Sequence, residues 1–347
     1  MPLLNRLFGA VLLACLVVTP VCGGPTVPRD TLPAILPLEL VPLGLNAKRP
    51  VPKESPLTEA RVQLGRKLFF DPILSRDKSI SCASCHRPDH AFAGTDAVAI
   101  GVGGKKGRRN APTLFNRAYA TQLFWDGRET SLEAQALKPI EDPLEMGNTV
   151  AEVVKRLKAH ADYPAEFKTA FGDDVSADNL GKALASFQRT LLLGNSRVDR
   201  FRLSLEAGEL NESERHGLWL WESKAKCWQC HNGPNFTDEQ FHNTGIGWGS
   251  EPRDLGRFEV TAKEADKGKF KTPTLRGVAW TAPYMHNGSI ATLEGVVEFY
   301  NKGGSPNPHL DSQLTPLGLT KQEMQNLVSF LRALSDGDGP TGKLGPK

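Results

Sequence analysis

Three common features are missing from the sequence, and each absence excludes a class of protein. The 42 lysine and arginine residues nearly balance the 39 aspartate and glutamate residues, so composition offers no case for nucleic-acid binding. No long apolar run follows the N-terminal segment, which excludes a membrane protein with several spans. No clear strand alternation appears either, so we expect the 347 residues to fold mainly as α-helices.

Cysteine is scarce, and its six positions leave none for a disulfide. Cys15 and Cys22 lie in the N-terminal segment. The other four form two copies of one short motif, Cys82-Ala-Ser-Cys85-His86 and Cys227-Trp-Gln-Cys230-His231.

The N-terminal segment has the layout of a secretory signal peptide. Arg6 gives a positive start, and the twelve apolar residues over 7–18 are too few to span a bilayer. Val21 and Gly23 suit the −3 and −1 positions, so cleavage is predicted after Gly23. The alternative is a lipidated Cys15, although this residue lies inside the apolar run. We therefore expect export to the periplasm, with a signal peptide over residues 1–23 and no membrane span in the mature chain.

Cys-x-x-Cys-His is the attachment signature of c-type haem. The two cysteines form thioethers with the haem, and the histidine ligates its iron. The alternatives are a redox-active cysteine pair, half of a zinc site or a disulfide. Two copies in an exported chain with no other mature cysteine favour two covalently attached c-type haems, with His86 and His231 as iron ligands.

The second half of the chain repeats the first in degenerate form. The segment from Ala111 aligns with the segment from Thr272 at an offset of 161 residues, which also brings Gly127 onto Gly288. The haem motifs are only 145 residues apart, so the second copy carries sixteen extra residues, which we place in the charged loop over 251–271. Such self-similarity predicts duplicated domains, each around one haem.

Prolines, periodicity and capping residues give a coarse map of the chain. Prolines indicate an extended arm over residues 24–56, and a helix is predicted to start at Ser55-Pro56. Further helices are predicted within 151–193, over 213–222, and after a capping box of Thr320 and Glu323. The tail over 336–347, rich in glycine and proline, is predicted to be flexible.

Tyr300 falls opposite Pro139 when the two copies are aligned. Thr292 is predicted to cap a helix that carries Leu293, Val297 and Tyr300 on its buried face. A phenol can ligate haem iron as phenolate, whereas a proline cannot. Tyr300 is then either the sixth ligand of the second haem or a core tyrosine with a hydrogen-bonded hydroxyl. In the first case the second haem is closed, and the first is open to a small molecule.

Two further residues lie near the predicted first haem. Glu145 comes just beyond the helix that carries Gln135 and Pro139. It is either a carboxyl that takes a proton from peroxide and returns it to the leaving oxygen, or a solvated loop residue. Trp125 precedes the same helix and is either an electron relay or a core tryptophan.

From Leu57 to Leu334 the chain resembles the bacterial di-haem cytochrome c peroxidase and MauG superfamily. The resemblance is carried by both haem motifs and by four more segments, Arg109-Asn-Ala-Pro-Thr-Leu114, Phe124-Trp-Asp-Gly-Arg128, Pro143-Leu-Glu-Met146 and Thr281-Ala-Pro-Tyr-Met-His-Asn-Gly288. It implies two tandem class-I-like cytochrome c domains, an N-terminal peroxidatic domain over 57–200 and a C-terminal electron-transfer domain over 201–335.

The resemblance also implies roles for single residues. Glu145 and Gln135 would lie in the distal pocket of the first haem, and Trp125 between the haems. One calcium ion between the domains would be coordinated, directly or through waters, by Asn110, Thr281 and Pro283. His242 and His286 match segments that surround the haems and are expected to bond propionates or backbone.

Two departures favour the MauG-like branch of this superfamily. Ordinary members carry methionine where this chain has Tyr300, and MauG-like members carry tyrosine. Ordinary members also carry a histidine in the loop that here spans 99–104 and has none. An anionic tyrosinate favours ferric iron and lowers the potential of its haem relative to methionine. In one respect the chain departs from MauG, because Ala225 replaces a tryptophan that faces the partner, with Trp228 nearby.

The resemblance implies an enzyme that reacts with hydrogen peroxide at the N-terminal haem. Its electrons would pass through the C-terminal haem, either from a small redox protein such as a cytochrome c or cupredoxin, or from aromatic residues of a protein substrate. The alternative is a non-catalytic di-haem electron-transfer cytochrome.

Overall fold

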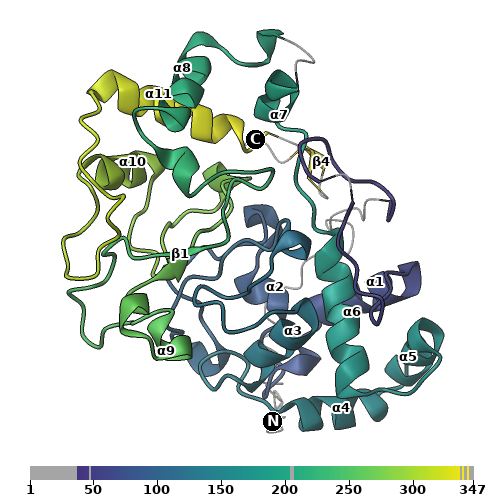
Figure 1. Ribbon diagram of the computed structural model, residues 1–347. Coiled ribbons are helices and arrows are strands. Elements are labelled where there is room, and N and C mark those ends of the chain that lie inside the picture. The colour runs from purple at the N-terminus through teal and green to yellow at the C-terminus, as the bar shows by residue number, and fades with distance from the viewer. Residues whose placement is uncertain (1–36, 47, 204–206, 337, 340–341, 344–347) are drawn as a thin grey trace, which may run out of the picture.

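The computed structural model describes residues 37–46, 48–203, 207–336, 338–339 and 342–343, and it is mainly helical, as expected (Figure 1). The predicted signal peptide and Cys15 lie outside the described residues. No helix in the described ranges is long and apolar enough to cross a membrane. The α-helices are α1 Glu59–Phe70, α2 Cys82–Cys85, α3 Leu132–Glu141, α4 Val150–Lys158, α5 Tyr163–Phe171, α6 Ala177–Thr190, α7 Arg197–Arg202, α8 Glu212–Glu222, α9 Phe258–Thr261, α10 Leu293–Asn301 and α11 Lys321–Ala333.

Strands are confined to two short antiparallel pairs in the described part of the chain. β1 (Phe241–His242) pairs with β2 (Phe270–Lys271), with Phe241 opposite Lys271. β3 (Asp338–Gly339) pairs with β4 (Gly342–Lys343) in the segment that was predicted to be a flexible tail. Neither pair forms a sheet that carries a core, so packing depends on the helices.

The first half is built on the crossing of α1 and α6. Gly65 permits this close contact, because a Cβ there would lie 1.9 Å from the backbone oxygen of Ala183. Phe69 and Phe187 pack beside the crossing with ring centroids 5.1 Å apart. The helix predicted from Ser55-Pro56 begins instead at Glu59, since the Thr58 hydroxyl accepts the hydrogen bond that caps it.

The second half repeats this crossing with α8 and α11, which Figure 1 shows at one end of the molecule. Gly217 takes the place of Gly65, because a Cβ there would lie 2.0 Å from the backbone oxygen of Asn326. Trp221 packs against Phe236 and Phe330, at 5.6 Å from each ring. The predicted capping box of Thr320 and Glu323 is present at the start of α11.

The 161-residue repeat seen in the sequence is also a repeat in the structure. The bridge between Leu123 and Glu129 recurs between Tyr284 and Ile290. Ser131 caps α3 through its side chain, and Thr292 caps α10 in the same way. The fold therefore places Pro139 and Tyr300 at equivalent points of two equivalent helices.

The described part of the N-terminal arm has neither helix nor strand, and it lies across both halves. The backbone oxygen of Gly44 accepts from the buried Arg276 side chain at 2.8 Å, and that of Leu43 accepts from Asn195 N at 2.7 Å. The predicted domain division at residue 200 falls within α7, whose Val198 packs in the second core.

Candidate active site

The first motif forms the one-turn helix α2, and its cysteines are free thiols. Burial raises the pKa of Cys82 to about 12 and that of Cys85 to about 11. His86 follows at the end of the helix, and its Nδ1 lies 3.1 Å from the backbone oxygen of Phe92. That hydrogen bond fixes the ring and leaves Nε2 free to ligate a metal.

The second motif forms a 3-10 turn, Cys227–Gln229, instead of an α-helix, but its histidine is held in the same way. His231 Nδ1 lies 3.0 Å from the backbone oxygen of Phe236. Phe92 and Phe236 both have positive φ, at 54° and 50°, so in each copy a strained turn aims a carbonyl at the histidine. Burial lowers the pKa of both His86 and His231, which keeps the imidazoles neutral as iron ligation requires. The residues of both motifs therefore fit a c-type haem.

A cavity that is open to solvent on one side lies beside the first motif. Cys82, Cys85 and His86 line it, and so do the predicted Gln135 and Glu145. Pro139, from the same helix as Gln135, also lines the cavity. The structure thus brings together the residues that the sequence placed around the first haem.

Glu145 presents a carboxyl with a perturbed pKa to this cavity. Burial and the negative charge of Asp142 raise its pKa to about 7, while the positive charge of Arg128 acts the other way. Its carboxylate oxygens make no hydrogen bond within the described part of the chain. A carboxyl that titrates near neutral pH suits both directions of proton transfer.

Tyr300 lies on α10 close to the second motif. The thiols of Cys230 and Cys227 act electrostatically on its phenol, and burial is the main cause that raises its pKa. No residue that the structure describes forms a hydrogen bond with the Tyr300 hydroxyl. The phenol oxygen is therefore available to an iron beside the second motif, as the ligand alternative requires.

Trp125 lies where the two halves meet. Its Nε1–H donates to the backbone oxygen of Asn110 at 2.9 Å, and its own backbone oxygen accepts from Lys271 N at 2.8 Å. The ring of His286 stands edge-on to it, with centroids 6.5 Å apart. Trp125 therefore contacts both halves of the chain, and its expected position between the haems stays a prediction.

The residues expected at calcium lie near contacts between the two halves, where Asn110 N donates to the backbone oxygen of His286 at 2.7 Å. Asn110 is buried and uses Nδ2 to donate to the backbone oxygen of Asp96, which leaves its Oδ1 without a hydrogen bond from the described chain. Thr281 donates its hydroxyl to the backbone oxygen of Val278. Pro283 follows Ala282, whose backbone oxygen lies 2.6 Å from His90 Nε2. Oxygen donors suit calcium.

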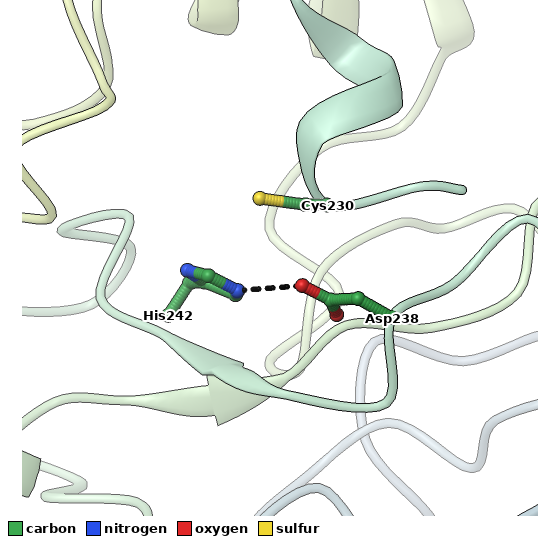
Figure 2. A group of neighbouring side chains, drawn as sticks. All are labelled: Cys230, Asp238 and His242. Carbon is green, nitrogen blue, oxygen red and sulfur yellow. Dashed lines mark hydrogen bonds and ion pairs between the residues drawn. The ribbon is translucent and has the colours of Figure 1, made fainter.

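Among the described residues, only Cys230, Asp238 and His242 form a cluster of three potential metal ligands (Figure 2). Both ring nitrogens of His242 are already taken, Nε2 by Asp238 at 3.1 Å and Nδ1 by Asp311 at 2.6 Å. Its pKa is raised to about 11, first by Asp238 and further by Cys230 and Asp311. His242 thus lies between two carboxylates, and a propionate partner for it stays a prediction.

Sequence reasoning missed Gln188, which also lines the first cavity. It is buried on α6 four residues after Leu184, another lining residue. The helical period already placed Leu184 on the inner face, so the residue four positions later was available as a signal.

Comparison with known proteins agrees with the geometry. Residues 59–207 match a family model described as di-haem cytochrome c peroxidase, and residues 269–301 match one described as RoxA-like, cytochrome c-like. The methylamine utilization protein MauG of Methylorubrum extorquens is 41% identical over 82% of this chain and 81% of its own. The chain belongs to the di-haem cytochrome c peroxidase and MauG family.

Other members of the di-haem peroxidase family align over most of their length. Cytochrome c551 peroxidase of Nitrosomonas europaea is 36% identical over 85% of this chain and 86% of its own. The crystal structure of a MauG-like protein associated with microbial copper homeostasis has a TM-score of 0.76 and 35% identity, over 86% of this chain and 94% of that one. The predicted resemblance to the family and its MauG-like branch is confirmed, and membership supports a di-haem peroxidase-type oxidoreductase with haem c.

Proposed function

We propose that the protein is a periplasmic di-haem oxidoreductase that reduces hydrogen peroxide at the haem of the first motif. Electrons reach that site through the haem of the second motif. The observation that carries the proposal is the difference between two equivalent helix positions, Pro139 and Tyr300. Pro139 offers no ligand atom to the cavity, and Tyr300 offers a phenol beside the second motif.

Two tandem cytochrome c domains would each hold one haem through thioethers to both cysteines of their motif. His86 and His231 would ligate the irons through Nε2, and Tyr300 would complete the second. When bound, the haems supply redox-active iron, at which peroxide binds and electrons are exchanged. Pro139 leaves the first iron without a side-chain ligand on that face.

Glu145 is the proposed general base and acid. Its carboxylate takes a proton from one peroxide oxygen and returns it to the oxygen that leaves as water. The Gln135 amide donates a hydrogen bond that orients the peroxide. With two electrons and two further protons, one peroxide gives two waters. Burial of Glu145 maintains the pKa that both transfers need.

Trp125 is the proposed relay between the two haems, in line with its contacts to both halves. Trp228 stands between the two cysteines of the second motif and is 46% exposed, which gives a partner access to that haem. The donor is a small redox protein, a cytochrome c or a cupredoxin, or a protein substrate whose aromatic residues are oxidised. Asn110, Thr281 and Pro283 are the proposed calcium ligands between the domains.

A titration of the purified ferric holoprotein with hydrogen peroxide tests the proposal. We expect the visible spectra of both haems to change with a stoichiometric amount of peroxide. A ferric protein without a high-spin haem, whose spectrum peroxide leaves unchanged, would instead be a non-catalytic electron-transfer cytochrome. Turnover with reduced cytochrome c then separates the two kinds of donor, since rapid turnover identifies a peroxidase and slow turnover a MauG-like oxidase of a protein substrate.

A further inference from the structure

The charged loop over 251–271, in which we place the sixteen extra residues of the second copy, contacts the first half of the chain. This loop, the insertion, contains α9 and β2, and in Figure 1 α9 lies beside the blue segments of the first half. Arg109 donates to both carboxylate oxygens of Asp254, at 2.7 and 2.8 Å. Arg108 donates to both oxygens of Glu259, at 2.9 and 2.7 Å. Two bidentate ion pairs therefore join the insertion to the chain that leads into Asn110.

The insertion also holds the backbone at Trp125 and the two residues that follow. Lys271 N donates to the oxygen of Trp125 at 2.8 Å. Arg257 Nη1 donates to the backbone oxygens of Asp126 and Gly127, each at 2.8 Å. The Asp126 carboxylate is only 5% exposed and accepts from Arg109 Nη1 at 2.5 Å. Arg109 therefore connects the insertion, through Asp254, to the residue next to Trp125.

The insertion also contributes the aromatic ring of Phe270, which reaches Trp125 through His286. Phe270 stacks on His286 with centroids 3.5 Å apart and planes at 10°. His286 in turn stands edge-on to Trp125. The Arg109 guanidinium lies 5.4 Å from the Phe270 ring. Trp125 is thus fixed by backbone hydrogen bonds, by ring packing and by an ion-pair network, all of which include residues of the insertion.

We propose that residues 254–271 are a clamp that positions Trp125 for electron transfer between the haems, with the Arg109–Asp254 pair as its central contact. The inference rests on the proposed relay role of Trp125. Arg109 and Asp254 act as positioning residues and touch no reacting atom. A relay needs a fixed distance and orientation, which a supporting layer of locked side chains provides. Because Arg109 is only 11% exposed, loss of the Asp254 carboxylate removes its bidentate partner and leaves Asp126 on one side only, so we expect the guanidinium to shift.

The test compares Asp254→Asn with the control Glu294→Gln in the holoprotein. Glu294 also pairs with an arginine, Arg332, but that pair is exposed and lies outside the insertion. Hydrogen exchange of a peptide over residues 121–130 reports the clamp directly. Flash reduction by one electron, followed by redistribution between the haems, reports electron transfer without any peroxide.

We expect Asp254→Asn to exchange faster over 121–130 and to slow redistribution about tenfold or more, with both haem spectra intact. Glu294→Gln should match the wild type. Arg109→Lys keeps the charge but loses the bidentate fork, and it should fall between the two. Unchanged exchange, or faster exchange with an unchanged redistribution rate, overturns the clamp. If the wild-type protein does not react with peroxide, only the proposed function is overturned. Neither hydrogen exchange nor electron redistribution requires peroxide, so both still test the clamp.

Discussion

Replacement of Glu145 by glutamine removes the proton-transfer group and changes little else. The carboxylate makes no hydrogen bond within the described chain, so an amide of the same size loses no contact and should leave the fold intact. General acid–base groups contribute about 10²- to 10⁴-fold. We therefore expect Glu145→Gln to slow the reaction of the ferric protein with peroxide by about that factor in stopped-flow measurements.

The pH dependence of the reaction with peroxide gives a more specific prediction than the loss of rate in Glu145→Gln. With a pKa of about 7, Glu145 is half deprotonated at pH 7. At pH 5 it is about 1% deprotonated, so the wild-type rate should fall about 50-fold between these pH values. Glu145→Gln should lose this dependence. Glu141→Gln is the control, because Glu141 is exposed, lies four residues before Glu145 and does not line the cavity. Its pH dependence should match that of the wild type. A wild-type rate that stays flat from pH 5 to 8 would refute the assignment of Glu145 as base.

Three further changes test other parts of the account. Tyr300→Phe removes the proposed ligand and should shift the low-spin spectrum and raise the potential of the second haem in a redox titration; an unchanged spectrum removes the assignment. Trp228→Ala should raise KM for a protein donor several-fold while the reaction with peroxide alone is unaffected, and an unaltered KM would place the donor elsewhere. Gly65→Ala forces a Cβ onto the Ala183 oxygen and should lower the free energy of unfolding by about 1–3 kcal/mol in denaturant titrations; Gly172→Ala is the control, with open space around it. A strained left-handed φ gives the control a small cost of its own, so a larger loss at Gly172 would contradict the packing argument.

The sequence was most informative where the two copies could be compared. The offset of 161 residues holds without a gap from Ala111 to α3 and α10, so it correctly set Tyr300 against Pro139. The assignment of His86 and His231 as iron ligands follows from a motif in which the histidine adjoins the second cysteine. Local patterns of this kind need no knowledge of the tertiary structure.

Contacts between distant segments had no such pattern. Arg109 and Asp254 are 145 residues apart, and nothing near either residue indicates its partner. The two carboxylates on His242 likewise come from different loops, so a backbone or propionate partner was the simpler expectation. The helix start at Ser55-Pro56 was wrong because Thr58, rather than Ser55, supplies the capping hydroxyl.

The central claim is that the two haems are inequivalent, with one iron open beside Glu145 and the other closed by Tyr300. Electron paramagnetic resonance of the ferric holoprotein tests this directly, because each haem gives its own signal. We predict one high-spin signal that an added small ligand alters, and one low-spin signal that only Tyr300→Phe alters. Two low-spin signals, or two signals that both respond to the small ligand in the wild type, would contradict the account.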